Sequence, residues 1–357
     1  MTLFLDYISS LEYWRTRSLP KGNPHPAAPS QRVSHQPKQD TARQNCDLAV
    51  MRLYKEAACN TEHVDLEIEL AILKEEVPNL TFPCHLLLPD ASARRSSKDV
   101  ICHVASPNRL PSRSFAAISN NVFVCSPELC FARAGITYNK MQLAQLGFEL
   151  CGTYRLGHFT NGTEPNQLKT AASKLTSAKA LDLFARLYSG KGCKAAKDVS
   201  RRILDSSASP MESLLALALS LPASQGGYGL PKPLLNKQIS TATAPLHSAF
   251  GNSFYCDLYW PDAKLDVEYD SELFHSGAMK IEHDARRRNS LCAMGVSVIT
   301  ATKSSVTNRH GLDQLASQIA RKLHVRLQLK RVNRDRQREL LDAFLHPGSQ
   351  SMPNAIK

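Results

Sequence analysis

The sequence predicts an α/β protein, because segments with the pattern of strands alternate with segments that have the pattern of helices. Residues 206–330 follow the order helix, strand, strand, helix, strand, helix. Strands interleaved with helices are typical of a sheet with helices packed on its faces. Residues 46–160 have a second, smaller mixture of the same kind. A chain of 357 residues suggests two or three domains.

The N-terminal region divides into an expected helix and an expected linker. Residues 1–15 include regularly spaced apolar side chains and predict a short N-terminal helix. Residues 16–45 are dominated by Pro, Ser, Gln, Asn, Lys and Arg and contain few large apolar residues. Such a segment buries too little surface to offset its ordering entropy, so we expect a disordered linker there.

A small α/β domain is expected over residues 46–160. It begins with a predicted helix over residues 46–58, and three apolar runs with strand character follow at 81–88, 99–104 and 121–125. A second helix is predicted at Ser126, where Ser is suited to the N-cap, Pro127 to the first helical position and Glu128 to the first turn.

Two further segments flank the C-terminal third of the chain. In residues 161–205 small and apolar side chains recur at three- and four-residue steps, which predicts a helical connector. Residues 331–357 are rich in Arg and polar residues and are expected to be a basic polar tail.

Residues 206–330 are expected to form the largest α/β unit. A helix begins at Ser209 and runs to about Leu221, and a Gly- and Pro-rich loop follows. The remaining expected elements are strands at 253–260 and 265–271, a helix at 280–294 that Gly295 ends, a strand at 296–302 and an amphipathic helix at 312–329.

Composition limits the classes of partner. The chain has 44 Lys+Arg against 32 Asp+Glu, a net charge of +12, which favours polyanions such as nucleic acid. No apolar run approaches the roughly 20 residues that a membrane span needs, so no membrane partner is expected. The N-terminus lacks the pattern of a secretory signal, and the ten cysteines form no C-x-x-C pair, so we expect a cytoplasmic protein with free thiols.

Acidic residues gather in two neighbouring predicted strands. Asp266, Glu268 and Asp270 alternate along one strand and therefore share a face. Asp257 lies on the preceding strand, which a tight turn brings alongside. Converging carboxylates repel one another, and Mg²⁺ relieves that repulsion because it prefers oxygen ligands. The pattern therefore predicts a divalent-metal site.

These residues resemble a known family. Asp257, the run Val267-Glu268-Tyr269-Asp270, His275 and the spaced Asp284, Arg287, Leu291 and Gly295 are similar to endonuclease-like proteins related to the very-short-patch mismatch repair endonucleases. That family belongs to the PD-(D/E)XK superfamily. The resemblance covers residues 206–330, about a third of the chain. It implies a restriction-endonuclease-like mixed sheet flanked by helices, a divalent metal, either Mg²⁺ or Mn²⁺, and hydrolysis of phosphodiester bonds.

The resemblance also implies roles for individual residues. Asp257 and Glu268 would bind the metal, His275 would activate water or orient a phosphate, and Glu212 on the first helix would approach the metal. Asp270 stands where many superfamily members have a lysine, and Ser271 stands where this branch usually has glycine. Both departures weaken the case for catalysis.

Each assignment has a structural alternative. Ser209 and Glu212 have the spacing of a capping box, in which the Glu212 side chain accepts from the backbone N–H of the N-cap residue Ser209. His275 fits an ordinary structural role, and Asp284 has the helical spacing of a salt bridge with Arg287 or Arg288. We expect nucleic-acid contacts from Arg287, Arg288, Lys322 and Arg326, although a solvated basic helix face explains the same charges.

Three functions remain open. The first is a metal-dependent endonuclease acting on DNA, or alternatively RNA, in defence or repair. The second is a catalytically inactive nuclease-fold protein that binds nucleic acid and regulates, and the third is a scaffold with no nucleic-acid role. The helix start at Ser126-Pro127-Glu128 after a strand resembles the C-terminal region of abortive-infection antitoxin regulators, which implies a role in phage defence or in the biology of mobile elements.

Overall fold

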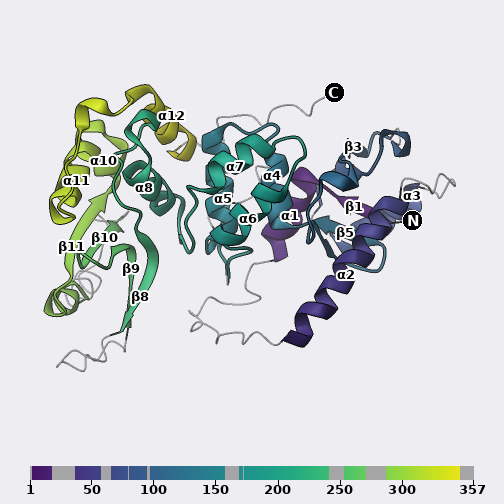
Figure 1. The fold of residues 1–357 in the computed structure, drawn as a ribbon, viewed down its shortest axis with the longest axis horizontal. Helices are drawn as coiled ribbons and strands as arrows, with labels where there is room; N and C mark the ends of the chain where they lie inside the picture. Colours follow the sequence, from purple (N-terminus) through teal and green to yellow (C-terminus); the bar gives the residue numbers. More distant parts are fainter. Residues whose placement is uncertain are drawn as a thin grey trace. The chain divides into compact units, whose positions relative to one another are not determined.

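The computed structural model describes residues 2–17, 37–57, 66–78, 80–94, 97–156, 169–171, 173–240, 253–270 and 287–345. The chain divides into two compact units (Figure 1). The first consists mainly of Met1–Leu150 and Arg155–Ile203, and the second of Cys151–Tyr154 and Leu204–Met352. Both contain mixed sheets and helices, which confirms the α/β class.

A five-stranded sheet, in the order β3-β2-β1-β5-β4, forms the centre of the first unit. Its strands are β1 (Leu3–Leu5), β2 (Cys84–Leu88), β3 (Val100–Val104), β4 (Phe115–Ala117) and β5 (Val122–Cys125). The central strand β1 pairs antiparallel with β2 and parallel with β5. The helix expected over residues 1–15 is therefore wrong at its start. Leu3, Phe4 and Leu5 are all buried, as a central strand with two covered faces requires.

Helices surround this sheet (Figure 1). They are α1 (Tyr7–Arg17), α2 (Pro37–Glu56), α3 (Leu66–Glu76), α4 (Pro127–Ala134), α5 (Lys140–Cys151), α6 (Ala178–Leu187) and α7 (Cys193–Ser200). The predicted cap at Ser126 is confirmed, since its hydroxyl accepts from the Leu129 N–H at 3.2 Å. A short two-stranded sheet pairs β6 (Tyr154–Arg155) with β7 (Lys169–Thr170), and 3-10 turns lie at Ala91–Ala93 and Pro107–Arg109.

Two expected boundaries in this unit need correction. The linker predicted over residues 16–45 is helical from Pro37 onward, and residues 18–36 lie outside the described part. The connector predicted over 161–205 contains α6 and α7, and both pack against α4. Buried Leu181, Phe184 and Val199 give these helices an apolar face that belongs to the first unit's core.

The second unit contains a four-stranded mixed sheet in the order β11-β10-β9-β8. Its strands are β8 (Leu234–Ser240), β9 (Ser253–Trp260), β10 (Leu265–Asp270) and β11 (Ser297–Thr302). The central β9 is antiparallel to β8 and β10, whereas β10 and β11 are parallel. The three predicted strands are confirmed, but β8 was not predicted. It lies at the sheet edge, where several side chains are exposed and polar, so it lacks an apolar strand pattern.

Helices α8 (Pro210–Ser220), α10 (Lys303–Thr307), α11 (Arg309–Lys322) and α12 (Arg334–Leu345) belong to the same unit, with 3-10 turns at Ala223–Gln225 and Leu329–Arg331. The predicted helix over 280–294 is described only for residues 287–293. It ends, as predicted, at Gly295, whose φ of +76° suits a residue without a side chain. The helix predicted over 312–329 is α11, which ends at Lys322.

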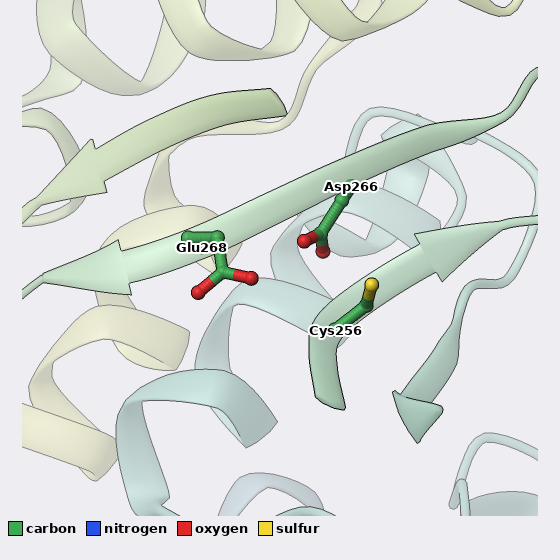
Figure 2. A group of neighbouring side chains, drawn as sticks. All are labelled: Cys256, Asp266 and Glu268. Atoms are coloured by element: carbon green, nitrogen blue, oxygen red, sulfur yellow. The ribbon is translucent and has the colours of Figure 1, made fainter. Parts of the chain in front are cut away.

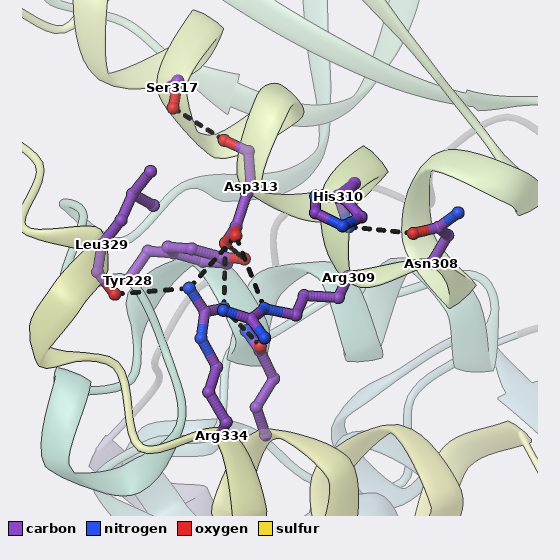
Figure 3. A network of polar contacts seen from close by, with 9 residues as sticks. Tyr228, Asn308, Arg309, His310, Asp313, Ser317, Leu329 and Arg334 are labelled. Carbon is purple, nitrogen blue, oxygen red and sulfur yellow. Dashed lines mark hydrogen bonds and ion pairs between the residues drawn. The ribbon is translucent and has the colours of Figure 1, made fainter.

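The expected tail over residues 331–357 is wrong for its first half. Leu340 and Phe344 of α12 are buried, and α12 packs against α8. Asp313 of α11 accepts hydrogen bonds from Arg334 at 2.9 Å and from the Tyr228 hydroxyl at 2.6 Å (Figure 3). Arg334 also donates to the Leu329 carbonyl at 3.3 Å. A basic residue expected in solvent is therefore part of a structural network.

None of the described helices is both long enough and apolar enough to cross a membrane.

Candidate functional site

The acidic residues of the second unit meet where β9 departs from regular pairing. The pairing of β9 with β10 ends at the pair Leu258 and Val267. The pairing of β9 with β8 is interrupted at one position, where Asn236 would otherwise face Asp257. Asn236 has a positive φ of 46°. Cys256 and Tyr259, three residues apart, pack in one apolar cluster. Strict alternation would put them on opposite faces, so the side-chain alternation shifts at Asp257.

Asp257 is half-buried at this interruption. Its Oδ2 accepts a hydrogen bond from the Tyr269 backbone N–H at 2.9 Å. Burial and the nearby negative charges of Glu268 and Glu212 raise the pKa of Asp257 to about 7, against the lowering effects of the Tyr269 N–H and Arg287. The structure thus places three of the predicted site residues close enough to share one electrostatic environment.

Glu212 belongs to the first turn of α8 and is buried. Its Oε2 accepts from the Ala208 N–H at 2.8 Å and from the Asn236 amide at 2.5 Å, and its Oε1 accepts from the Ser209 hydroxyl at 2.9 Å. Half of the expected capping box is present, because Ser209 accepts from the Glu212 N–H, whereas Glu212 accepts from the Ala208 N–H in place of the Ser209 N–H. Burial raises the pKa of Glu212, and Glu268 adds to that effect.

Glu268 forms an ion pair with Arg287. Both guanidinium amino groups reach its carboxylate, Nη1 to Oε2 and Nη2 to Oε1, the latter at 2.7 Å. Arg287 also donates to the Tyr255 carbonyl. A bidentate pair of this type is geometrically specific and neutralises one carboxylate of the group. The sequence predicted both residues at the site but not their contact with each other.

Asp266 and Cys256 extend the acidic centre beyond the predicted residues. Asp266 and Glu268 project from β10 toward Cys256 on β9, and one ligand atom of each of the three lies within 4.8 Å of the others (Figure 2). Asp266 is fully buried, and neither of its carboxylate oxygens has a hydrogen-bond partner among the described residues. Burial and neighbouring Glu268 raise its pKa to about 9. The alternation of β10 already placed Asp266 beside Glu268, whereas nothing in the sequence marked Cys256.

The remaining predicted residues lie at the margins. Asp270 ends β10 and is half-buried, two residues beyond Glu268. His275 lies outside the described residues, as does Asp284, so their predicted roles are not addressed by the fold.

Three predicted nucleic-acid contacts lie on the exposed surface of this unit. Arg288 donates to the Thr300 hydroxyl at 3.2 Å, and Lys322 donates to the Ser297 hydroxyl at 3.3 Å. Both hydroxyls belong to the edge strand β11, and Thr300 is the register partner of Glu268. Arg326 is exposed beyond α11. Arg288 therefore contacts the strand beside Glu268, whereas the Lys322 partner Ser297 pairs with Leu265 at the opposite end of β10.

The donor set suits a divalent cation. Asp257, Glu268 and Glu212 offer carboxylate oxygens from three elements, and the described residues place one guanidinium, that of Arg287, directly on them. Burial, and after it the negative charges of Glu268 and Glu212, raise the pKa of Asp257, and a bound cation would oppose both effects. Arg287 would have to cede at least one Glu268 oxygen to the metal.

No protein-family profile matches this chain, and no solved structure matches it. Over 96 residues, or 27% of this chain, it is 31% identical to uncharacterized proteins from two strains of Mycobacterium tuberculosis. The match spans 32% of each relative, so the chain covers about a third of the length of the curated relatives it matches.

Proposed function

We propose that the second unit is a divalent-metal-dependent nuclease that hydrolyses phosphodiester bonds of DNA, with RNA as the alternative substrate. The observation that carries the proposal is the grouping of Glu212, Asp257 and Glu268 from α8, β9 and β10. Carboxylates held together in this way with a single arginine are the ligand set that Mg²⁺ or Mn²⁺ accepts alongside substrate phosphates. The mixed sheet flanked by helices agrees with the fold that the sequence resemblance implies.

In this proposal the residues of the site have different roles. Asp257 and Glu268 hold the metal, and Glu212, fixed by its three hydrogen bonds, sets the position of the first helix beside them. When bound, the cation would lower the pKa of a coordinated water and stabilise the charge that develops on the phosphodiester. Arg288, Lys322 and Arg326 neutralise backbone phosphates without reading sequence.

Two observations favour a second function. Arg287 occupies both oxygens of Glu268, and Asp270 stands where a catalytic lysine is common in the superfamily that the sequence resembles. A permanent Arg287–Glu268 pair would leave a nuclease-like unit that binds nucleic acid through its basic residues and does not cleave it. Such a protein would be regulatory.

Cleavage assays decide between the two functions. Supercoiled plasmid, single-stranded DNA and RNA are incubated with wild type, Asp257→Ala, Glu268→Ala and the double variant in Mg²⁺ or Mn²⁺. The matched control is Asp262→Asn, which changes an exposed acid in the turn between β9 and β10. We expect metal-dependent cleavage by wild type and Asp262→Asn. We expect it to fall at least about a hundredfold in each single variant, as for loss of one major transition-state contact.

The other outcomes are equally informative. Equal cleavage by wild type and the double variant would mean a contaminating nuclease and would contradict the proposal. Salt-sensitive binding of DNA or RNA without cleavage would establish the regulatory function instead. A cytoplasmic location and a role in defence or repair follow from the same proposal and stay predictions.

A further inference from the structure

We propose that Cys256, Asp266 and Glu268 form a second metal site, which takes a thiophilic divalent cation of the zinc type. The site lies on β9 and β10 and needs two residues, Cys256 and Asp266, that the proposed nuclease centre does not use. The inference therefore goes beyond the proposed function and shares only Glu268 with it.

The geometry is close to that of a coordinated ion. The sulfur of Cys256 and one carboxylate oxygen each from Asp266 and Glu268 lie within 4.8 Å of one another (Figure 2). Bonds of roughly 2.0–2.3 Å put the ligands of a tetrahedral zinc about 3.3–3.8 Å apart. Closing by the order of 1 Å is within the range of side-chain rotation, so the backbone need not move.

Asp266 supplies the independent reason to expect a ligand. Its side chain is fully buried and points toward Cys256 and Glu268, and both of its oxygens lack a partner among the described residues. Burying a carboxyl group without hydrogen bonds costs free energy. A cation bound between Asp266 and the two ligand atoms that it faces would supply the missing interaction.

The ligand types select the metal. A thiolate is a poor ligand for Mg²⁺, which requires hard oxygen donors, but a good one for Zn²⁺ and Co²⁺. Two carboxylates and one thiolate provide three negative charges against the two positive charges of the metal. The Arg287 guanidinium, already on Glu268, balances the remaining charge. A fourth position is left for water or another ligand.

Cobalt titration of the full chain tests the site. Bound Co²⁺ shows a sulfur-to-metal charge-transfer band only when a thiolate is a ligand, so the band identifies cysteine coordination without an activity assay. We expect wild type to develop the band at one Co²⁺ per chain and Zn²⁺ to abolish it by displacement. The band should disappear in Cys256→Ser, and Asp266→Asn should weaken Co²⁺ binding at least tenfold. Cys292, whose thiol is exposed, provides the matched control, because the Cys292→Ser variant should keep the band.

Circular dichroism identifies any variant that fails to fold. If Cys256→Ser is unfolded, Cys256→Ala replaces it in the cobalt titration. The rise in the thermal unfolding midpoint of wild type on addition of Zn²⁺ then serves as a second measurement of metal binding. A band that persists in a folded Cys256 variant overturns the proposal. So does the absence of any thiolate band in wild type with excess Co²⁺.

Asp257→Asn separates this proposal from the nuclease. We expect this variant to lose cleavage and to keep the cobalt band, because Asp257 is outside the thiolate site. A wild type that cleaves DNA but shows no band would refute the second metal site alone. A band without cleavage would refute the nuclease alone.

Discussion

Arg287 is the residue that controls the charge of the acidic centre. It neutralises Glu268, contacts the Tyr255 carbonyl and lowers the pKa of nearby Asp257, against the stronger effect of burial. In the proposed nuclease, a metal at Asp257 and Glu268 would compete with this guanidinium. A nucleic-acid phosphate would offer Arg287 an alternative bidentate partner. Substrate binding and metal binding would then assist each other.

We predict that Arg287→Ala binds Mn²⁺ several-fold more tightly than wild type when nucleic acid is absent. The reason is that displacing a partly exposed arginine pair costs on the order of 1 kcal/mol, and 1.4 kcal/mol corresponds to tenfold in affinity. Isothermal titration calorimetry measures the affinity. Arg288→Ala is the control, because Arg288 is exposed and donates to Thr300. Equal or weaker Mn²⁺ binding by Arg287→Ala would show that the pair does not compete with metal.

At the scale of elements, α12 extends the second unit beyond residue 330, where the sequence predicted its end. Its sequence is rich in arginine, yet Leu340, Ala343 and Phe344 form a buried face against the unit. Arg334 anchors the start of the helix to Asp313. The helix therefore stabilises the unit through a narrow apolar face. Its many charged residues make that face difficult to recognise from the sequence.

We predict that Leu340→Ala lowers the free energy of unfolding of the second unit by about 2–4 kcal/mol, the usual range for a fully buried leucine. The exposed neighbour provides the control, and Glu339→Ala should change stability by less than about 0.5 kcal/mol. Urea unfolding of both variants in a Trp14→Phe background, followed by Trp260 fluorescence, measures both changes. Indistinguishable unfolding of the two variants would mean that α12 does not contribute to the core.

At the scale of the whole molecule, each unit carries its own spectroscopic reporter. The chain has two tryptophans, Trp14 in α1 of the first unit and Trp260 in β9 of the second. Trp14 donates to the Cys125 carbonyl and Trp260 to the Pro231 carbonyl, each at 2.8 Å. Replacing one tryptophan with phenylalanine leaves the other to report on a single unit.

The first unit contains a histidine pair, with His85 buried and His103 half-buried, that should make its stability sensitive to acid. Nδ1 of His85 and Nε2 of His103 are 2.8 Å apart, and the rings are stacked. Burial and the neighbouring His103 lower the pKa of His85 to about 4, while Asp6 opposes the shift. Burial also lowers the pKa of His103. Protons therefore bind the unfolded chain more readily than the folded unit, and stability falls as pH drops below the ordinary histidine pKa.

We predict that, in the Trp260→Phe variant, the free energy of unfolding of the first unit falls by about 2 kcal/mol between roughly pH 7 and pH 5. The reason is that a difference of one unit between the folded and unfolded pKa is worth about 1.4 kcal/mol. Urea unfolding monitored by Trp14 fluorescence at each pH measures this loss. His85→Asn in the same background removes the His85 share of the proton-binding difference and should make the pH dependence shallower, although it weakens the unit at neutral pH. An unchanged pH slope in His85→Asn would assign the acid sensitivity to other groups.

The sequence by itself determined the α/β class, three of the four strands in the second unit, the cap at Ser126 and the end of a helix at Gly295. These features depend on neighbouring residues, since strand periodicity, capping hydroxyls and positive φ are local properties. Strand alternation and a tight turn also placed Glu268 near Asp257, whereas Glu212 became a site candidate only through the family resemblance.

Only the tertiary structure decided the features that depend on distant partners. Leu3–Leu5 joins a sheet because strands far along the chain leave a central position for it, and α12 joins the second unit because it packs against α8 and Arg334 donates to Asp313. The shift of alternation at Asp257 brings Cys256, rather than Asp257, into one ligand group with Asp266 and Glu268. Arg287 reaches Glu268 across 19 positions of sequence. No periodicity encodes such contacts, because packing between elements selects them.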